Sequence, residues 1–206
     1  MSHQGHSCEG DHDHDDTPEM GIQYSLYEKI DMDAVECLNE QIDGSGKTIF
    51  KPWEERLDVS KFVESDADAE LLFNIPFTAN IKLKGVLVIG GEGGHQPARM
   101  RLFKNRPNMT FDDVGCAADQ EFDFPNDNNG VLEYSTMVVK FSSVTHLSIH
   151  FPSNYGADTT KIYYIGLRGE YTKAHNHGVT ICMYESRPQV SDHKVKDESL
   201  LSRQVQ

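Results

Sequence analysis

The sequence predicts an all-β protein, a jelly-roll β-sandwich with a polar tail at each end. Short apolar segments recur about ten residues apart, and most links between them contain Gly, Asn, Asp or Pro. Hardly any segment shows the 3.6-residue periodicity of a helix. Many short strands joined by turn-rich links are typical of sandwiches and jelly rolls, so this fold class is the first expectation.

Two segments near the C-terminal half are the clearest strands of the chain. Side chains of a strand alternate between its faces, so Leu147, Ile149 and Phe151 share one face of a strand over residues 146–151. Residues 162–167 are apolar or aromatic almost throughout, as expected for a strand covered on both faces. The link between them is rich in Asn, Gly and Asp, which favour turns. The sequence therefore predicts a central strand pair here.

The remaining elements can be taken in chain order. Asp31 or Asp33 is a suitable N-cap for a short helix that ends at Leu38. The segment 81–89 starts amphipathic and becomes continuously apolar, and Gly85 lies where the alternation slips, which predicts a β-bulge. The other expected strands are residues 71–77, 100–104, 120–124, 131–134, 138–141 and 179–184.

The two tails differ in composition from the rest of the chain. The length of 206 residues suits one domain, which we expect over residues 21–187, with a flexible polar tail over 188–206. Residues 1–20 are rich in His and Asp with almost nothing apolar to bury, so disorder is expected. The alternative is a zinc, copper or nickel site in this tail, because imidazole, thiol and carboxylate groups are suitable ligands.

Net charge and cysteine usage exclude several classes of protein. The formal charge of −14 is the wrong sign for binding nucleic acid or an anionic membrane directly. No apolar run of about 18 residues could span a bilayer, and the N-terminus lacks the apolar core of a signal peptide. The four cysteines form no C-x-x-C pair, which favours reduced structural thiols. We expect a protein of the cytoplasm, with the nucleus as a second location.

Three patterns suggest ligand chemistry but are better explained as structure. GSGKT at residues 44–48 resembles a phosphate-binding loop, but Gln41 stands where that motif requires glycine. The acidic run 64–70 lacks the glycine and the terminal glutamate of a calcium loop. His146 and His150 share a strand face and could bind a metal with Asp158, yet no further ligand can be identified. Structural or surface histidines are the preferred interpretation.

Catalysis has little support in the sequence. There is no G-x-S-x-G turn, no H-E-x-x-H motif and no cysteine with an evident histidine partner. The many Asp and Glu residues show no spacing that singles out an acid and base pair. We therefore expect no enzymatic activity, no cofactor and no metal centre.

Several long motifs occur over residues 21–187: CLNE at 37–40, FKPWEER at 50–56, KFVESDAD at 61–68, LLFNIPF at 71–77, KLKG at 82–85, NYGADTT at 154–160 and YIGLRGE at 164–170. Together they resemble the PITH domain family, and they stand in the order of that family. The resemblance implies a galactose-binding-like jelly roll and a non-catalytic protein that binds the regulatory particle of the proteasome. Sharing a fold with sugar-binding domains establishes no sugar site.

Charged and aromatic residues within these motifs are the candidates for contact with a partner. Trp53 is either a packing residue or an anchor for a partner or ligand. Arg168 and Glu170 lie beside a buried run and form either an internal ion pair or a partner contact. The alternative function is binding of a small ligand or carbohydrate, with Trp53 and Tyr155 stacking on it from loops at one end. The candidate partner-binding residues are Lys51, Trp53, Glu54, Arg56, Asp158, Arg168 and Glu170.

Overall fold

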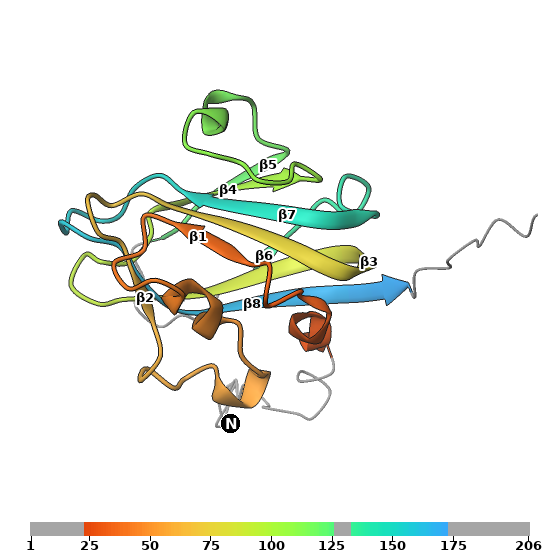
Figure 1. Cartoon of the computed structure of the whole chain (residues 1–206), viewed down its shortest axis with the longest axis horizontal. Coiled ribbons are helices and arrows are strands. Elements are labelled where there is room, and N and C mark those ends of the chain that lie inside the picture. The colour runs from red at the N-terminus through yellow and green to blue at the C-terminus, as the bar shows by residue number, and fades with distance from the viewer. Residues whose placement is uncertain (1–22, 126–132, 173–206) are drawn as a thin grey trace, which may run out of the picture. The chain divides into compact units, whose positions relative to one another are not determined.

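A computed structural model describes residues 23–125 and 133–172, which are built mainly from antiparallel strands (Figure 1). No helix among these residues is long and apolar enough to cross a membrane. The strands are β1 (Glu36–Leu38), β2 (Val63–Glu64), β3 (Leu71–Gly90), β4 (Arg99–Lys104), β5 (Gln120–Asp123), β6 (Glu133–Ser135), β7 (Val144–Phe151) and β8 (Lys161–Thr172). Short 3₁₀ helices lie between strands or precede them: η1 (Ser25–Lys29), η2 (Ser45–Ile49), η3 (Trp53–Glu55) and η4 (Asp113–Gly115).

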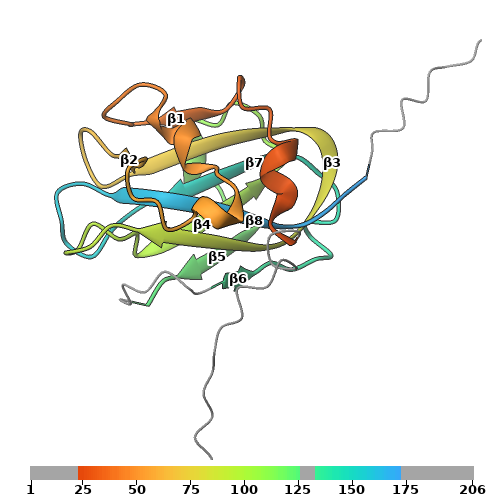
Figure 2. The same ribbon diagram turned by 90° about the horizontal axis from the view of Figure 1, so that it is seen from below.

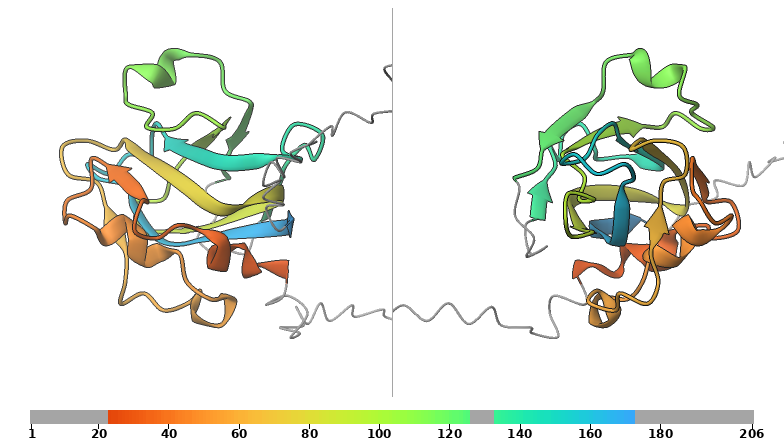
Figure 3. Two further views of the ribbon diagram at one scale, coloured as in Figure 1. Left: turned by 45° about the vertical axis from the view of Figure 1, so that its right-hand side comes forward. Right: turned by 90° about the vertical axis from the view of Figure 1, so that its left-hand side faces the viewer.

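Strand β3 joins the two layers of the sandwich. Its first half pairs with β1 and β7, and its second half pairs with β8 and β6. The register with β7 shifts between Pro76 and Ile81, where the strand bends from one layer into the other (Figure 3). Proline has no N–H to donate, so it is tolerated at such a break in pairing. One layer therefore has the order β1-β3-β7-β4-β5 and the other β2-β8-β3-β6, as expected for a jelly-roll sandwich.

The core lies between the two layers, and the alternation of each strand explains which side chains fill it. In β3, Val86 and Val88 point inward and are buried, and the fully buried Leu102 meets them from the opposite layer in the same core cluster. The rings of Phe73 and Phe151 pack edge to face with their centroids 6.0 Å apart. The predicted all-β sandwich is confirmed.

The segments 146–151 and 162–167 are strands, but they do not pair with each other. Both pair with β3: Ile149 of β7 lies opposite Phe73, and Ile165 of β8 lies opposite Val88. The prediction of a central strand pair is wrong in this respect. The turn-rich link of residues 152–160 carries the chain from one layer to the other. The two strands therefore both form hydrogen bonds with β3 and none with each other.

Other expected elements also differ in the structure. The short helix ending at Leu38 is absent, because residues 36–38 form β1 and pair with the start of β3. The strand expected over residues 138–141 is a turn that ends at the buried Phe141. The bulge at Gly85 is confirmed by the register shift between Leu83 and Gly85. The tails expected over 1–20 and 188–206 and the strand expected over 179–184 lie outside the described residues.

Candidate functional site

The outer face of the β3–β8 layer carries a second, smaller aromatic cluster. Leu87 of β3 and Tyr164 of β8 point away from the main core because their neighbours along each strand point into it. Tyr24, which precedes η1, completes the buried part of this cluster. Trp53 of η3 and Ile89 pack at its edge. Figure 2 looks onto this face and shows η1 and η3 lying over the strands.

Trp53 is held in place by contacts on its ring. Its indole stacks on Tyr24 with ring centroids 4.4 Å apart and an interplanar angle of 21°. The guanidinium carbon of Arg56 lies 4.1 Å from the centroid of the indole ring, and Arg56 Nη1 donates to the Trp53 carbonyl over 3.0 Å. Such a stack contributes about 0.5–1.5 kcal/mol beyond the burial of its area, and an exposed cation–π contact about 0.5–1 kcal/mol. The three side chains therefore behave as one ordered unit.

Glu133 links this unit to β8. Its carboxylate accepts a hydrogen bond from the Tyr24 hydroxyl over 2.7 Å and one from Arg168 Nε over 2.7 Å. A second guanidinium nitrogen of Arg168 lies 2.5 Å from the same carboxylate. Burial, and then the bond to Glu133, raises the pKa of Tyr24, while the bond to Glu133 raises the pKa of Arg168. Tyr24 thus remains a donor and Arg168 remains a cation.

Two glycines leave room for this arrangement. A Cβ atom on Gly85 would overlap the carboxyl group of Glu133. A Cβ atom on Gly166 would lie 2.7 Å from the ring of Tyr164. Both glycines sit on the outer face of the layer, where the aromatic and charged side chains must approach the backbone closely. These positions explain why glycine interrupts two otherwise apolar strands.

Three of the seven predicted partner-binding residues are brought together here. Trp53 and Arg56 stack on each other, and Arg168 joins them through Glu133 and Tyr24. Neither Tyr24 nor Glu133 was expected from the sequence, because Tyr24 and Glu133 are separated by 109 residues. The one sequence feature related to Glu133 is Gly85, a glycine within the facing strand that leaves room for the Glu133 carboxyl group.

The other candidates near η3 differ sharply in exposure. Glu54 is exposed beside Trp53. Lys51 is buried, with 4% of its surface accessible, and its ammonium group donates to the Asp58 carbonyl over 2.6 Å. Burial lowers the pKa of Lys51. This contact gives Lys51 a structural role, since it fastens the chain that follows η3.

Glu170 and Asp158 lie outside the aromatic cluster. Glu170 is exposed and forms an ion pair with Lys84, which lowers the pKa of the Glu170 carboxyl group. Arg168 pairs with Glu133 instead of Glu170, so both residues have internal ionic partners. Asp158 is exposed in the loop between β7 and β8.

His150 is a buried structural histidine. It is only 2% exposed, and its Nε2 atom lies 2.6 Å from a carboxylate oxygen of Glu70. Burial lowers the pKa of His150, so the neutral ring donates Nε2–H to Glu70. Within residues 23–125 and 133–172, no three His, Cys, Asp or Glu side chains lie close enough to hold a metal. The structural interpretation of His150 is the one its contacts support.

The GSGKT segment has its backbone donors occupied. A carboxylate oxygen of Glu40 accepts the N–H of Gly44 over 2.6 Å, and the other accepts the N–H of Gly46 over 2.6 Å. The Ser45 hydroxyl also donates to Glu40 over 3.2 Å. In a phosphate-binding loop these amides would face the phosphate. A side chain of the same chain fills that position here, which supports the interpretation as a structural loop.

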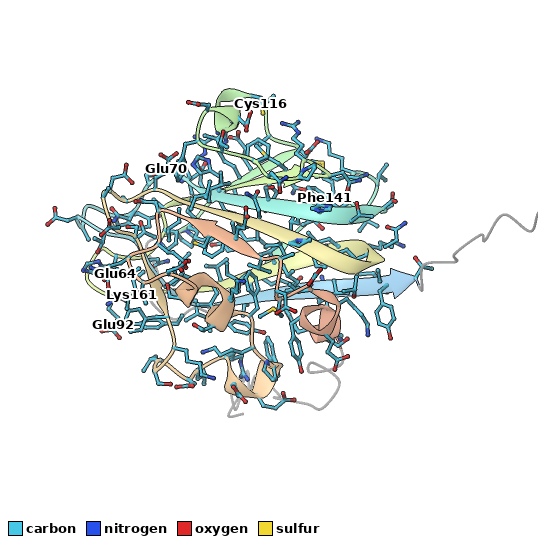
Figure 4. All side chains as sticks on the ribbon, viewed as in Figure 1. Glu64, Glu70, Glu92, Cys116, Phe141 and Lys161 are labelled. Atoms are coloured by element: carbon cyan, nitrogen blue, oxygen red, sulfur yellow. The ribbon has the colours of Figure 1, made fainter. Side chains whose placement is uncertain are left out.

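The two cysteines within the described residues have different surroundings. Cys37 is half-buried, and burial raises the pKa of its thiol. Cys116 is exposed near η4 (Figure 4), with Arg106 Nη1 2.6 Å from its sulfur. Both are free thiols, as expected. Because Cys116 is exposed, only Cys37 fits the expectation of a packed structural cysteine. Cys8 and Cys182 lie outside the described residues.

The aromatic rings proposed for stacking on a small ligand make internal contacts. Trp53 stacks on Tyr24, as described above. The Tyr155 hydroxyl donates to the Phe124 carbonyl. Stacking on a sugar needs an accessible ring face, and the Trp53 ring already has Tyr24 and the Arg56 guanidinium packed against it. These contacts favour a structural role for both residues.

Comparison with known proteins identifies close relatives. The family model described as the PITH domain matches residues 16–188. The chain is 61% identical over 194 residues to PITH domain-containing protein CG6153 of Drosophila melanogaster, covering 94% of this chain and 92% of that protein. It is 53% identical over 195 residues to PITH domain-containing protein 1 of Homo sapiens, with 94% and 92% covered.

Solved structures with a similar fold are carbohydrate-binding modules. The CBM32-1 and CBM32-2 domains of Clostridium perfringens ZmpB superpose with a TM-score of 0.52 at 8% identity, over 77% of this chain and 41% of that chain. The same domains in complex with GalNAc give a TM-score of 0.50 at 8% identity, over 75% and 39%. At this level of identity the similarity concerns the fold alone, which is a galactose-binding-like jelly roll.

Proposed function

The chain belongs to the PITH domain family, and on this basis we propose that it is a non-catalytic protein-interaction module that binds the regulatory particle of the proteasome. A role as a regulatory adaptor in another large assembly is the broader form of the same proposal. The module would act in the cytoplasm and in the nucleus. The relatives of Drosophila melanogaster and Homo sapiens are named as PITH domain-containing proteins and not as enzymes, which supports a binding role.

The observation that carries the proposal is the surface around η3, which we call the Trp53 surface and define as Trp53, Glu54, Arg56, Leu57 and Val59. Leu57 is 69% exposed and Val59 is 61% exposed, next to the ordered stack of Trp53 and Arg56. Tryptophan and arginine are enriched among residues that dominate binding energy at protein interfaces. A pre-ordered stack loses little conformational entropy on binding, so this surface is suited to a partner protein.

The contacts of the ionisable groups also support a binding role. Glu133 is saturated by Tyr24 and Arg168, and His150 is buried against Glu70. A general acid or base needs access to a substrate proton. Glu133 instead holds β6 to β8 and to the chain before η1, and His150 holds β7 to the residue before β3.

The test is affinity purification of the full chain from cells, with quantitative mass spectrometry of regulatory-particle subunits. The double variant Leu57→Ser/Val59→Ser removes exposed apolar groups of the Trp53 surface, and Ile42→Ser is the matched control because Ile42 is 62% exposed outside that surface. We expect enrichment of these subunits by the wild type and by Ile42→Ser, and a loss of about tenfold or more in the double variant. Absence of enrichment by the wild type would refute the proposal.

Two alternatives rest on less. Carbohydrate binding is favoured only by the fold shared with a GalNAc-binding module, and the rings of Trp53 and Tyr155 make internal contacts instead. Metal binding by the His-rich tail of residues 1–20 concerns a segment outside the described residues, so it stays a prediction. Isothermal titration calorimetry with zinc, comparing the full chain with a chain lacking residues 1–20, tests the second alternative.

A further inference from the structure

The turn between β6 and β7 exposes three consecutive large apolar residues. We call it the Val139 turn and define it as Met137, Val138 and Val139. Met137 is 56% exposed and Val139 is 91% exposed. Scattered single apolar residues are normal on a protein surface, but a consecutive run at one projecting turn is not. This turn lies apart from the Trp53 surface: it is at the end of the sandwich where β7 begins, whereas η3 lies below β8 in the view of Figure 1.

The Val139 turn is held in a fixed conformation. The N–H groups of Lys140 and Phe141 both donate to the Met137 carbonyl, over 2.9 and 3.1 Å. The N–H of Met137 donates to the Gln120 side chain over 2.8 Å. Phe141 is fully buried in the core beside β7 and fastens the end of the turn (Figure 4). The apolar side chains are therefore presented in advance, which lowers the entropy cost of binding a partner.

Two lysines flank the turn without a carboxylate partner among the described residues. Lys140 Nζ donates to the Asp119 carbonyl over 2.8 Å, and Lys104 Nζ donates to the Lys140 carbonyl over 2.9 Å. The one carboxylate in this group, that of Asp119, accepts the backbone N–H of Lys104 over 2.7 Å. Both ammonium charges thus stand beside the exposed apolar residues.

The charge at the two ends of the sandwich differs. Glu64, Glu70 and Glu92 lie at the end where β7 finishes, together with Lys161, which pairs with Glu64; Phe141 and the Val139 turn lie at the opposite end (Figure 4). The chain carries a formal charge of −14, but the ammonium groups of Lys104 and Lys140 bond only backbone carbonyls among the described residues. We propose that the Val139 turn and its two lysines dock an acidic segment of a partner protein that carries at least one apolar side chain.

Charge complementarity favours a protein segment over a membrane. An anionic bilayer would also attract two lysines and an apolar tip. A bilayer, however, faces a broad area of a molecule that is strongly acidic as a whole, and each lysine near the surface adds only about 1 kcal/mol. A narrow peptide can contact the turn and its lysines alone, and at physiological ionic strength exposed charges farther away than about 8 Å are largely screened.

The test starts from selection of a random displayed peptide library against the full chain. We expect selected peptides to carry excess Asp and Glu and at least one aliphatic or aromatic residue. The dissociation constant of one selected peptide is then measured by fluorescence anisotropy for the wild type and for variants. Val139→Ser should weaken binding about tenfold, whereas Val139→Leu and the distant Ile42→Ser should leave it unchanged. Lys140→Gln should weaken binding several-fold and Lys140→Arg should not.

Three outcomes would overturn the proposal. The first is selection of neutral or basic peptides. The second is equal affinity of the wild type and Val139→Ser for an acidic peptide. The third is sedimentation with phosphatidylserine vesicles that Val139→Ser abolishes, in the absence of any peptide binding, which would assign the turn to a membrane. Because Val139 lies outside the Trp53 surface, failure here leaves the proposed binding to the regulatory particle to be judged by its own test.

Discussion

At the scale of single residues, Glu133 has the largest share in organising the candidate site. It lies on a strand of three residues, yet it joins Arg168 of β8 to Tyr24, which in turn supports Trp53. The side chains of Arg168 and Glu133 are only 25% and 23% exposed, so this pair is better shielded from solvent than a surface salt bridge. Removing one partner of such a network leaves the others with unmet hydrogen bonds.

We predict that Glu133→Gln lowers the free energy of unfolding by about 1–2 kcal/mol, because Arg168 loses its ionic partner. Urea denaturation followed by circular dichroism measures the change. Glu170→Gln is the control, since Glu170 is 61% exposed in its pair with Lys84 and should change stability by less than about 0.5 kcal/mol. Equal effects of the two substitutions would contradict the prediction.

His150 should make stability depend on pH. Burial lowers its pKa from the ordinary value of 6.5, with a smaller contribution from Arg101 and an opposing one from Glu70. Between the lowered pKa and 6.5, the unfolded chain binds a proton that the folded chain does not. The free energy of unfolding should therefore fall as the pH drops below about 6.5.

Urea denaturation over a pH series, comparing the wild type with His150→Gln, measures this contribution. The variant should lose the part of the slope that arises just below pH 6.5. If His150→Gln keeps the full slope, the histidine is not its source.

At the scale of elements, the two halves of β3 have different structural roles. The first half closes the layer that contains β7, and the second half carries the glycine that admits Glu133. The bulge beside Gly85 turns this position toward the outer face. The site therefore depends on the strand geometry as much as on the side chains that form it.

We predict that Gly85→Ala lowers the free energy of unfolding by about 1–3 kcal/mol, because its methyl group displaces the Glu133 carboxylate from Arg168. In a Glu133→Ala background the same substitution should cost much less. A double-mutant cycle by urea denaturation should give a coupling energy of about 1–2 kcal/mol. Gly115→Ala is the control, because an added Cβ there meets nothing within 4 Å. A coupling energy near zero would contradict the mechanism.

Local patterns could predict the strands but not their partners. Alternation at Leu147, Ile149 and Phe151 reports that one face is buried, and it carries no information on which strand lies alongside. The two-residue strand β2 is too short to show any period. The apolar run 138–141 was expected to be a strand, but its first two residues are exposed and only Phe141 is buried. The contact between Tyr24 and Glu133 spans 109 residues and leaves no local trace.

At the scale of the molecule, the layers should unfold together because β3 belongs to both. We predict that Leu102→Ala, at a fully buried position in β4, lowers the free energy of hydrogen exchange in β7 by about 2–5 kcal/mol. The free energy of exchange in β8 should fall by the same amount. Hydrogen exchange read by mass spectrometry measures it, and Val139→Ser serves as a control that should leave protection unchanged. Loss of protection in β7 alone would show that the layers open separately.

Because β3 pairs with a strand far along the sequence, folding of the nascent chain must wait for synthesis of that strand. Asn80 near the bend of β3 meets Thr172 at the end of β8, 92 residues later. A ribosome that adds about 5–20 residues per second needs several seconds or more to cover that distance. During this interval the second half of β3 has been made, but its partner strand β8 is not complete. We therefore expect chaperones to bind the newborn chain until β8 has left the exit tunnel.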